Sequence, residues 1–347
     1  MNELPSISII VPVYKVENYI IDCLKSVSSQ QYDGHVECIL VDDCGEDDSM
    51  ALAKEYIESY KGSVSFVIYA HSHNRGLSAA RNTGMQHATG DYLFFLDSDD
   101  ELLPEAFSIL TRPILQEEFD VVAGLMRTVG SDYDFNCAHP SSLTLRNKDI
   151  LHEYALNHIA PMACNKLFRR QMVIQNQLSF YEGIIHEDEL WSFQIAVIAH
   201  SFHLVEEETY LYKIREGSIT TANSIEKRRA SLHIIFCESQ KLCKKHELLN
   251  DQVVQTKIES FRLVILKDLC KNWVAFKNEY CSLRAVAVPT WKSDFKLVCL
   301  HPIRFIRNFH YALPSSCGAV YHYIWIRLTS VLYKHKLNHL NPLQTVH

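Results

Sequence analysis

Several features that would place this 347-residue sequence in other classes of protein are missing or scarce. No uninterrupted apolar run approaches the ~18–20 residues that a helix needs to span a bilayer. The 11 cysteines are scattered, without Cys-x-x-Cys pairs or regular spacing, which argues against a disulfide framework or a zinc site. With 11 glycines and 10 prolines, no stretch resembles a low-complexity linker or an internal repeat.

The start of the sequence, MNELPSISIIVPVY, also lacks the basic and long apolar segments of a signal peptide. Together with the unpaired cysteines, this predicts an intracellular, cytoplasmic protein. At 47% hydrophobic residues, the chain can bury a large core, and its length suits a main domain with an appendage.

The formal net charge of −7 is unevenly distributed along the chain. Residues 1–100 contain 16 acidic and 6 basic residues, whereas residues 261–347 contain 3 acidic and 12 basic residues. The acidic part suits metal binding, and the basic part suits an anionic surface. No nucleic-acid-binding motif accompanies the basic part, so we expect no nucleic-acid partner.

Strand-like and helix-like patterns alternate over the first 125 residues. Strands are expected at 6–13, 36–41, 64–69, 92–96 and 120–125, with helices at 17–29, 48–60, 77–88 and 103–112. This alternation predicts an α/β fold with a parallel sheet flanked by helices. The pattern then weakens, with helices expected at 147–158 and 187–199, a strand pair near 203–213, and helices over 225–280.

The most informative stretch is GDYLFFLDSDDELLP at residues 90–104, where a buried-type strand ends in four acidic residues. Asp97 and Asp99 are two residues apart, so in extended backbone they would share a face. Oxygen ligands of this kind suit a hard cation such as Mg²⁺ or Mn²⁺. The alternative is an acidic turn in which Asp99 or Asp100 caps the following helix.

Polar clusters follow other expected strands as well. Tyr14 and Glu17 follow the first strand and Asp42-Asp43 the second, and a doubly wound sheet would bring these strand ends to one edge. Arg81 sits among small residues in an expected helix, where it could reach a diphosphate or the acidic loop. Its alternative is an ordinary surface ion pair. Together these groups describe a nucleotide-diphosphate site.

Four segments resemble, in order and spacing, the successive blocks of a family 2 glycosyltransferase with the GT-A fold. They are VPVYKVENYI, VDDCGEDDS, NRGLSAARNTG and GDYLFFLDSDDELLP, and weaker similarity continues to about residue 221. The resemblance implies a Rossmann-like, mostly parallel sheet and a mainly helical C-terminal extension. It also implies an inverting enzyme that uses a nucleotide-diphospho-sugar, most often a UDP-sugar, with Mg²⁺ or Mn²⁺.

The resemblance assigns roles to residues on the nucleotide side. Pro12, Tyr14 and Glu17 would contact the uridine, and Asp43 would accept a hydrogen bond from the uracil ring. The sequence departs from the family pattern at Cys44-Gly45-Glu46, where Gly-Ser-Thr is usual, which leaves the detail of this loop open.

On the diphosphate side, Asp97 and Asp99 resemble the outer members of the family's DxD motif. Asp97 would hold the ribose or a water beside the metal, and Asp99 would bind the metal that bridges the diphosphate. Arg215 resembles a residue of the loop that closes over the donor phosphates; its alternative is an exposed arginine on a hairpin.

A second acidic cluster, GIIHEDELW at 183–191, resembles the family's Glu-Asp motif. The matching position makes Asp188 the base that accepts the proton of the acceptor hydroxyl. Glu187 and Glu189 would support it. The alternative is an acidic helix start, which the helix dipole favours without any catalytic role.

These considerations predict a GT-A catalytic domain at 1–222, with a nucleotide-binding half at 1–125 and an acceptor-binding half at 126–222. A helical, basic region would follow at 223–347. Residues 301–347 contain no acidic residue and carry an apolar stripe with tyrosines and a tryptophan. This segment could lie on the inner membrane surface. Alternatively it packs on the catalytic domain or on a second copy in a homodimer.

The expected reaction adds one sugar to a glycan or lipid-linked acceptor in capsule, exopolysaccharide or lipopolysaccharide synthesis. A Gln-x-x-Arg-Trp motif, usual in processive synthases, is absent. An aspartyl-phosphate phosphatase also places Asp-x-Asp after a strand, but it normally has Thr or Val where this chain has Glu101. A non-catalytic sugar-nucleotide-binding or scaffold protein is the remaining alternative, and the joint presence of Asp43, Asp97, Asp99 and Asp188 argues against it.

Overall fold

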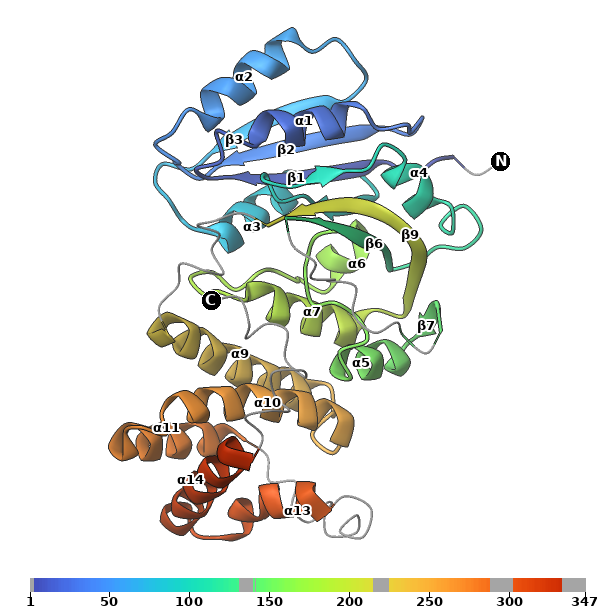
Figure 1. Cartoon of the computed structure of the whole chain (residues 1–347). Coiled ribbons are helices and arrows are strands. Elements are labelled where there is room, and N and C mark those ends of the chain that lie inside the picture. Colours follow the sequence, from blue (N-terminus) through green and yellow to red (C-terminus); the bar gives the residue numbers. More distant parts are fainter. Residues whose placement is uncertain (1–2, 131–139, 141, 215–224, 288–301, 333–347) are drawn as a thin grey trace. The chain divides into compact units, whose positions relative to one another are not determined.

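The computed structural model describes residues 3–130, 140, 142–214, 225–287 and 302–332 (Figure 1). The chain divides into two compact units: unit 1 comprises residues 1–183 and 187–215, and unit 2 comprises residues 184–186 and 216–347. The expected boundary at 222/223 falls outside the described residues. Across the described ranges, no helix combines the length and the apolar character that crossing a bilayer requires.

The first half of unit 1 is the expected doubly wound parallel sheet. Its strands are β1 (Ile7–Val13), β2 (Val36–Asp42), β3 (Ser65–Ala70) and β4 (Tyr92–Phe95), in the order β3-β2-β1-β4. The connecting helices are α1 (Ile20–Ser28), α2 (Ser49–Ser59) and α3 (Leu77–His87). Because the strand order reverses after β3, right-handed connections place α1 and α2 on one side of the sheet and α3 on the other (Figure 1).

The second half of unit 1 extends the same sheet with mixed strand directions. Its strands are β8 (Lys166–Arg169), β6 (Val121–Val129), β9 (Ser201–Lys213), β5 (Glu101–Leu102) and β7 (Thr144–Arg146). Strand β8 runs antiparallel between β4 and β6. The strand pair expected near 203–213 is wrong: this segment is one 13-residue strand, β9, which pairs with β6 over most of its length.

The described part of unit 1 has four further helices: α4 (Ala106–Thr111), α5 (Lys148–Ala155), α6 (Arg170–Gln175) and α7 (Glu187–Ile198). An aromatic cluster fixes α7 to the sheet. Trp191 of α7 is fully buried, stacks on Phe180 with ring centroids 4.3 Å apart, and meets Phe95 of β4 edge-on at 5.7 Å. Such ring pairs add to the burial of large apolar area, so the start of α7 is held beside the end of β4.

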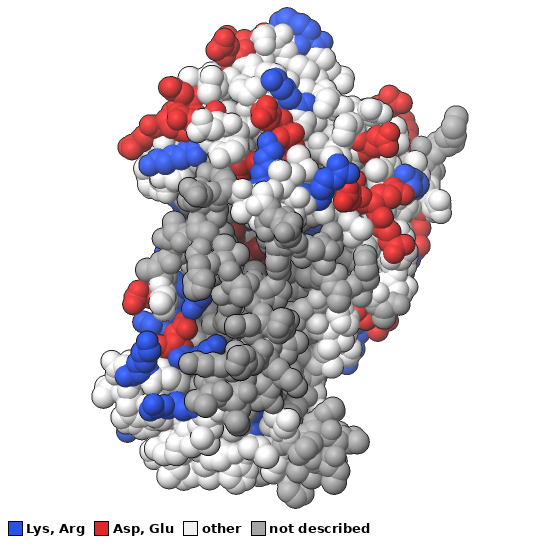
Figure 2. All heavy atoms as spheres, viewed as in Figure 1, with Lys and Arg blue, Asp and Glu red and all other residues white. Residues whose placement is uncertain are grey.

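The sheet order brings three loops to one edge. Strand β1 lies between β2 and β4, and all three run in the same direction. The loops that follow them, at 14–19, 43–48 and 96–100, are therefore neighbours, as expected for a ligand site in an open α/β sheet. Figure 2 shows groups of acidic side chains on the visible face of unit 1, in line with the acidic composition of its first 100 residues.

The described part of unit 2 is helical, as the sequence predicts. It consists of α9 (Ile225–Lys245), α10 (Gln252–Asp268), α11 (Trp273–Val286), α13 (Pro302–Asn308), the 3₁₀ helix η1 (Phe309–Ala312) and α14 (Ser315–Leu332). Two of the helices have capping side chains: Asp251 accepts from the amides of Val253 and Val254, and Asn272 accepts from the amide of Ala275. These caps satisfy amides that would otherwise lack partners.

A buried polar network joins η1 to α10 and α11. His310 is fully buried, and its Nε2 lies 3.0 Å from Nη2 of Arg262. Because a guanidinium only donates, Nε2 must accept; Nδ1 then carries the proton and donates to the Tyr280 hydroxyl at 2.8 Å. Burial and the charge of Arg262 lower the pKa of His310, so the folded protein holds it neutral. Burial likewise lowers the pKa of the neighbouring His322.

We expect unit 2 to lose stability as the pH falls below about 6.5. The unfolded chain binds protons on these histidines there, whereas the folded chain excludes them, so each contributes up to about 1.4 kcal/mol per pH unit. Urea unfolding between about pH 5 and pH 7.5 measures this slope. His310→Phe should flatten it, and His35→Gln, at an exposed histidine of unit 1, should not. An unchanged slope in His310→Phe would contradict the prediction.

Candidate active site

The acidic side chains of the loop after β4 differ in burial. Asp100 is buried: its Oδ2 accepts from the Tyr210 hydroxyl and its Oδ1 from the Lys213 amide, both at 2.8 Å. Burial, reinforced by the charges of Asp97 and Asp99, raises the pKa of Asp100 well above its usual range. Asp100 thus ties the loop to β9, whereas the Asp97 side chain remains 28% exposed and Asp99 is half-buried.

The donor set of this loop fits a divalent cation that also binds a substrate phosphate. Magnesium is commonly held by one or two carboxylates, with phosphate and water oxygens completing the shell. Asp99 provides such a carboxylate at the carboxyl edge of the sheet, next to Asp97. Within the described residues, no group of three or more His, Cys, Asp or Glu side chains is arranged to hold a metal ion.

Arg81 joins this loop to the start of α7. Its side chain is 4% exposed; Nη2 donates to Oδ1 of Asp97 and Nη1 to Oε1 of Glu187, each at 2.8 Å. The guanidinium also lies over the ring of Phe180, 5.2 Å from its centroid. Helix α3 carries Arg81 and lies close to the sheet at Gly84. A Cβ at position 84 would lie 2.3 Å from the side chain of Ile10, so glycine permits this close approach.

Arg81 is therefore not the surface residue of the alternative interpretation, and its guanidinium is buried. Both of its terminal nitrogens already have carboxylate partners, and these partners raise its pKa against the opposing effect of burial. It bridges two acidic segments that would otherwise repel each other. The diphosphate contact that we expected from the position of Arg81 in the sequence stays a prediction.

Asp188 lies in the first turn of α7, next to Glu187. Its Oδ1 accepts from the amide of Glu189 at 2.9 Å. Part of its surface is exposed, yet removal of the carboxyl group from water raises the pKa of Asp188 to about 8. The charges of Glu187 and Glu189 act in the same direction, and Arg81 opposes them. Such a carboxylate is a stronger proton acceptor than an ordinary aspartate.

Asp43 holds the loop that precedes α3. It is 2% exposed, and its carboxylate accepts from the amides of Arg75 and Gly76, each at 2.8 Å, and contacts Nδ1 of His71 at 2.7 Å. Gly76 has φ = 87°, a left-handed conformation that favours glycine. Nε2 of His71 in turn lies 2.9 Å from the Thr83 hydroxyl. His71 is a partner of Asp43 that the sequence motifs did not indicate.

The residues expected to contact uridine lie at the end of β1. Pro12 is buried within the strand, and Tyr14 is 41% exposed. Glu17 Oε2 accepts from the amide of Asp48 at 3.1 Å, which links this loop to the start of α2. Beside them, a hollow of about 350 Å³ is lined by Val13, Asp42, Ser49, Met50 and the 44–47 loop. The uridine contacts expected of Pro12, Tyr14 and Glu17 stay a prediction. Arg215 lies outside the described residues.

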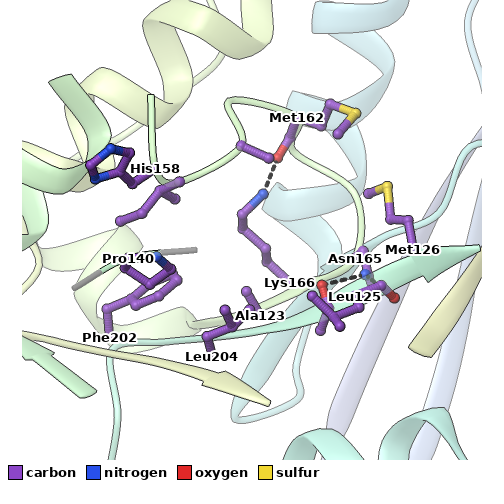
Figure 3. Close-up of a pocket in the computed structure, with 13 residues that line it drawn as sticks. Ala123, Leu125, Met126, Pro140, His158, Met162, Asn165, Lys166, Phe202 and Leu204 are labelled. Carbon is purple, nitrogen blue, oxygen red and sulfur yellow. Dashed lines mark hydrogen bonds between the residues drawn. The ribbon is translucent and has the colours of Figure 1, made fainter. Parts of the chain in front are cut away.

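A second pocket, with about 470 Å³ of empty space, lies beside β6 and the 158–166 loop (Figure 3). Its walls are mainly apolar and include Ala123, Leu125, Met126, Ile159, Phe202 and Leu204. Lys166 points toward the loop and donates to the carbonyl of Met162 (Figure 3). Ser192 of α7 donates to the carbonyl of Pro161 in the same loop. The pocket wall is thus tied to the helix that carries Asp188.

Solved structures share this architecture. The chain superimposes on Staphylococcus aureus TarS 1–349 in complex with UDP-GlcNAc with a TM-score of 0.72 and 17% identity. The superposition covers 94% of this chain and 92% of the TarS chain. A mannosyltransferase of Pyrobaculum calidifontis, PcManGT, in complex with GDP-Man and Mn²⁺, gives a TM-score of 0.52 at 14% identity, over 96% and 88% of the two chains. These similarities assign the chain to the GT-A fold.

Sequence comparison finds the same kind of similarity. Residues 8–176 match the model of glycosyl transferase family 2. Glycosyltransferase GlyA of Streptococcus pneumoniae is 29% identical over 230 residues, and EpsH of Bacillus subtilis is 32% identical over 225 residues. Each match covers 62% of this chain, but only 31% of GlyA and 63% of EpsH. These matches to glycosyltransferases disfavour the phosphatase interpretation.

Proposed function

We propose that this protein is a metal-dependent, inverting glycosyltransferase that moves one sugar from a UDP-sugar to a hydroxyl of a glycan or lipid-linked acceptor. The observation that carries the proposal is the connection Asp97–Arg81–Glu187, with 2.8 Å at each contact. It joins the loop suited to a metal-bound diphosphate to the helix turn that holds Asp188. A donor and an acceptor bound at these two segments would meet near Arg81.

In the proposed reaction, the acceptor oxygen forms a bond to the anomeric carbon from the face opposite the leaving group. The bond from that carbon to the diphosphate breaks, and its electron pair leaves with the nucleoside diphosphate. Asp188 takes the proton of the acceptor hydroxyl as the new bond forms. When bound, the divalent cation neutralises charge that develops on the diphosphate. Asp99 would hold this cation, and Asp97 would be fixed beside it by Arg81.

The nucleotide end of the donor would occupy the edge formed by the loops after β1 and β2. Tyr14 offers an exposed ring there, and Asp43 holds the loop before α3 in place. The proposal of a UDP-sugar draws support from TarS, a fold relative whose structure contains UDP-GlcNAc. Arg215 would contact the donor diphosphate, as the family resemblance implies.

The acceptor would enter from the second half of unit 1, where the pocket beside the 158–166 loop adjoins α7. Relatives named for teichoic acid synthesis support a surface polysaccharide as the acceptor: the match to GgaB of Bacillus subtilis is 30% identical over 214 residues. We place the reaction in the cytoplasm, on the side of the membrane where nucleotide sugars would be supplied to capsule, exopolysaccharide or lipopolysaccharide synthesis.

The test is release of UDP from a panel of UDP-sugars with Mg²⁺ or Mn²⁺, with and without glycan acceptors, and stereochemical analysis of the product. We expect one donor to be preferred, acceptor-dependent release to exceed hydrolysis, and the product to have inverted anomeric configuration. A retained configuration would contradict the role of Asp188. If neither UDP-sugars nor GDP-sugars bind in the presence of either metal, a scaffold protein becomes the favoured interpretation.

Replacing Asp99 with alanine tests the metal assignment. We expect donor affinity in the presence of Mn²⁺ to fall about 100-fold or more, because loss of a metal ligand removes several kcal/mol of phosphate binding. Titration calorimetry with the UDP-sugar, with Mn²⁺ and with EDTA, measures the effect. Asp33→Asn, at an exposed aspartate that precedes β2 at the opposite edge of the sheet, is the matched control. Metal-dependent binding that survives Asp99→Ala would refute the assignment.

A further inference from the structure

Helix α14 of unit 2 turns an apolar face to solvent. Val320, Ile324 and Leu328 follow one another at intervals of four residues and are 46%, 52% and 61% exposed. Residues at this spacing lie on one side of a helix. The opposite side of α14 carries buried residues, among them Ala319 and Ile326, which pack within unit 2. The outward apolar side chains are therefore additional to those that hold the helix in place.

The exposed apolar surface continues onto neighbouring elements. Ile303 and Ile306 of α13 are 65% and 48% exposed, and Phe309 of η1 is 37% exposed. The Tyr321 ring of α14 lies 5.7 Å from that of Phe309, and its hydroxyl donates to the carbonyl of Ile306. We name the six side chains Ile303, Ile306, Phe309, Val320, Ile324 and Leu328 the α14 surface. Contiguous exposed apolar patches on soluble domains commonly mark interaction sites.

Aromatic side chains border the α14 surface. On one flank is Tyr321; on the other, Tyr323 stands between α14 and the 37% exposed Trp273 of α11, with ring centroids 5.1 Å apart. Tyrosine and tryptophan combine an apolar ring with a polar group. They are therefore favoured at the boundary between hydrocarbon and water.

Within the described parts of α11, α13 and α14, the exposed charged side chains are basic. The exposed basic residues are Lys277 on α11, Arg327 on α14 and Lys271 just before α11. The acidic residues of α10 and α11 are engaged: Asp268 pairs with Arg228 and Glu279 with His233, while Glu259 is buried against Arg262. Residues 301–347 contain no acidic residue. In Figure 2, the described residues at the lower end of unit 2 are mostly white, that is, uncharged, in this view.

We propose that the α14 surface binds the face of a membrane that contains anionic lipids, with the apolar side chains inserted among the lipids and the basic residues at the headgroups. Apolar burial and attraction to anionic headgroups strengthen such binding together. A second copy fits less well. A twofold interface through this surface would bring the two basic borders together and place like charges opposite each other.

Co-sedimentation of the full chain with vesicles of phosphatidylcholine, alone and with phosphatidylserine, tests the proposal. We expect binding to the anionic vesicles that weakens as salt is raised, and little binding to phosphatidylcholine alone. Ile324→Glu combined with Leu328→Glu should lower the affinity at least tenfold. Ile174→Glu, at a 55% exposed isoleucine of unit 1, is the matched control and should bind like the wild type.

A second pair of changes guards against loss of folding. Lys271→Glu with Lys277→Glu alters only exposed side chains, and it should weaken binding to anionic vesicles at least tenfold. Circular dichroism and UDP-sugar binding verify that each variant is folded. Vesicle binding that is unchanged in both double variants would overturn the proposal. A second result would also overturn it: the wild type forms a dimer in solution and does not bind vesicles, and Ile324→Glu with Leu328→Glu dissociates that dimer. The partner of the α14 surface would then be a second copy of the chain.

Discussion

Replacing Asp188 with asparagine is expected to lower kcat for sugar transfer by about 10²–10⁴-fold and to leave UDP-sugar affinity close to that of the wild type. Asparagine preserves the size of the side chain and can still accept from the Glu189 amide, but it cannot take a proton. The donor diphosphate would be bound at the other side of Arg81, so its affinity should change little. Single-turnover transfer and calorimetric donor binding separate the two quantities.

The competing interpretation makes Asp188 an acidic residue that merely favours the helix start. Asp149, in the first turn of α5, provides the matched control because it is exposed and occupies such a position in the same unit. Loss of a helix-start charge costs about 0.3–1 kcal/mol of stability and no chemistry. If Asp188→Asn behaves like Asp149→Asn, with transfer retained and only a small change in stability, the base assignment is wrong.

The pH profile gives a separate readout of Asp188. A base works only when deprotonated, so kcat/KM falls as the pH drops through its pKa. Burial raises the pKa of Asp188 to about 8, and we expect the acidic limb of the profile well above the pH at which an ordinary aspartate titrates. The charge of Glu189 contributes to this rise, so Glu189→Gln should shift the limb to lower pH. A limb that stays fixed would indicate that another group is titrating.

The sequence predicted those parts of the site that are local in the chain. Asp97, Asp99 and Asp43 follow apolar strands, and the alternation of strands and helices places their loops at one edge. Strand β8 was not predicted because it has only four residues, two of them basic, and it becomes a strand by pairing with β4 and β6. Similarly, β9 is long because it pairs with β6 over most of its length, which its own sequence pattern does not indicate.

Contacts between distant residues could not be predicted from the motifs. Arg81 and Glu187 are separated by 106 positions, and their pairing depends on the packing of α3 and α7 around β4. His71 is one of two histidines just after β3, and no sequence pattern indicates that it meets Asp43. The same holds for His310, whose partners come from α10 and α11. In each case, the tertiary fold gives a buried polar group its partners.

Replacing Arg81 with methionine should lower the free energy of unfolding by about 3–5 kcal/mol. Methionine fills much of the space and keeps the contact with Phe180, but it leaves Asp97 and Glu187 near each other without the cation between them. Urea unfolding measures the change. Arg75→Met is the matched control, because Arg75 pairs with Glu182 at 3.2 Å with both side chains over 40% exposed, and such pairs contribute ~0–1 kcal/mol.

Arg81→Lys distinguishes the bridge from a direct contact with the donor. Lysine keeps the charge but lacks the planar fork that reaches two carboxylates at once, so stability should fall by part of the methionine effect. Because a bridge orders both Asp97 and Glu187, kcat should fall together with stability while donor affinity changes less. If Arg81→Lys instead retains stability and loses donor affinity, Arg81 contacts the diphosphate itself. If Arg81→Met costs no more stability than Arg75→Met, the bridge does not hold the two acidic segments together.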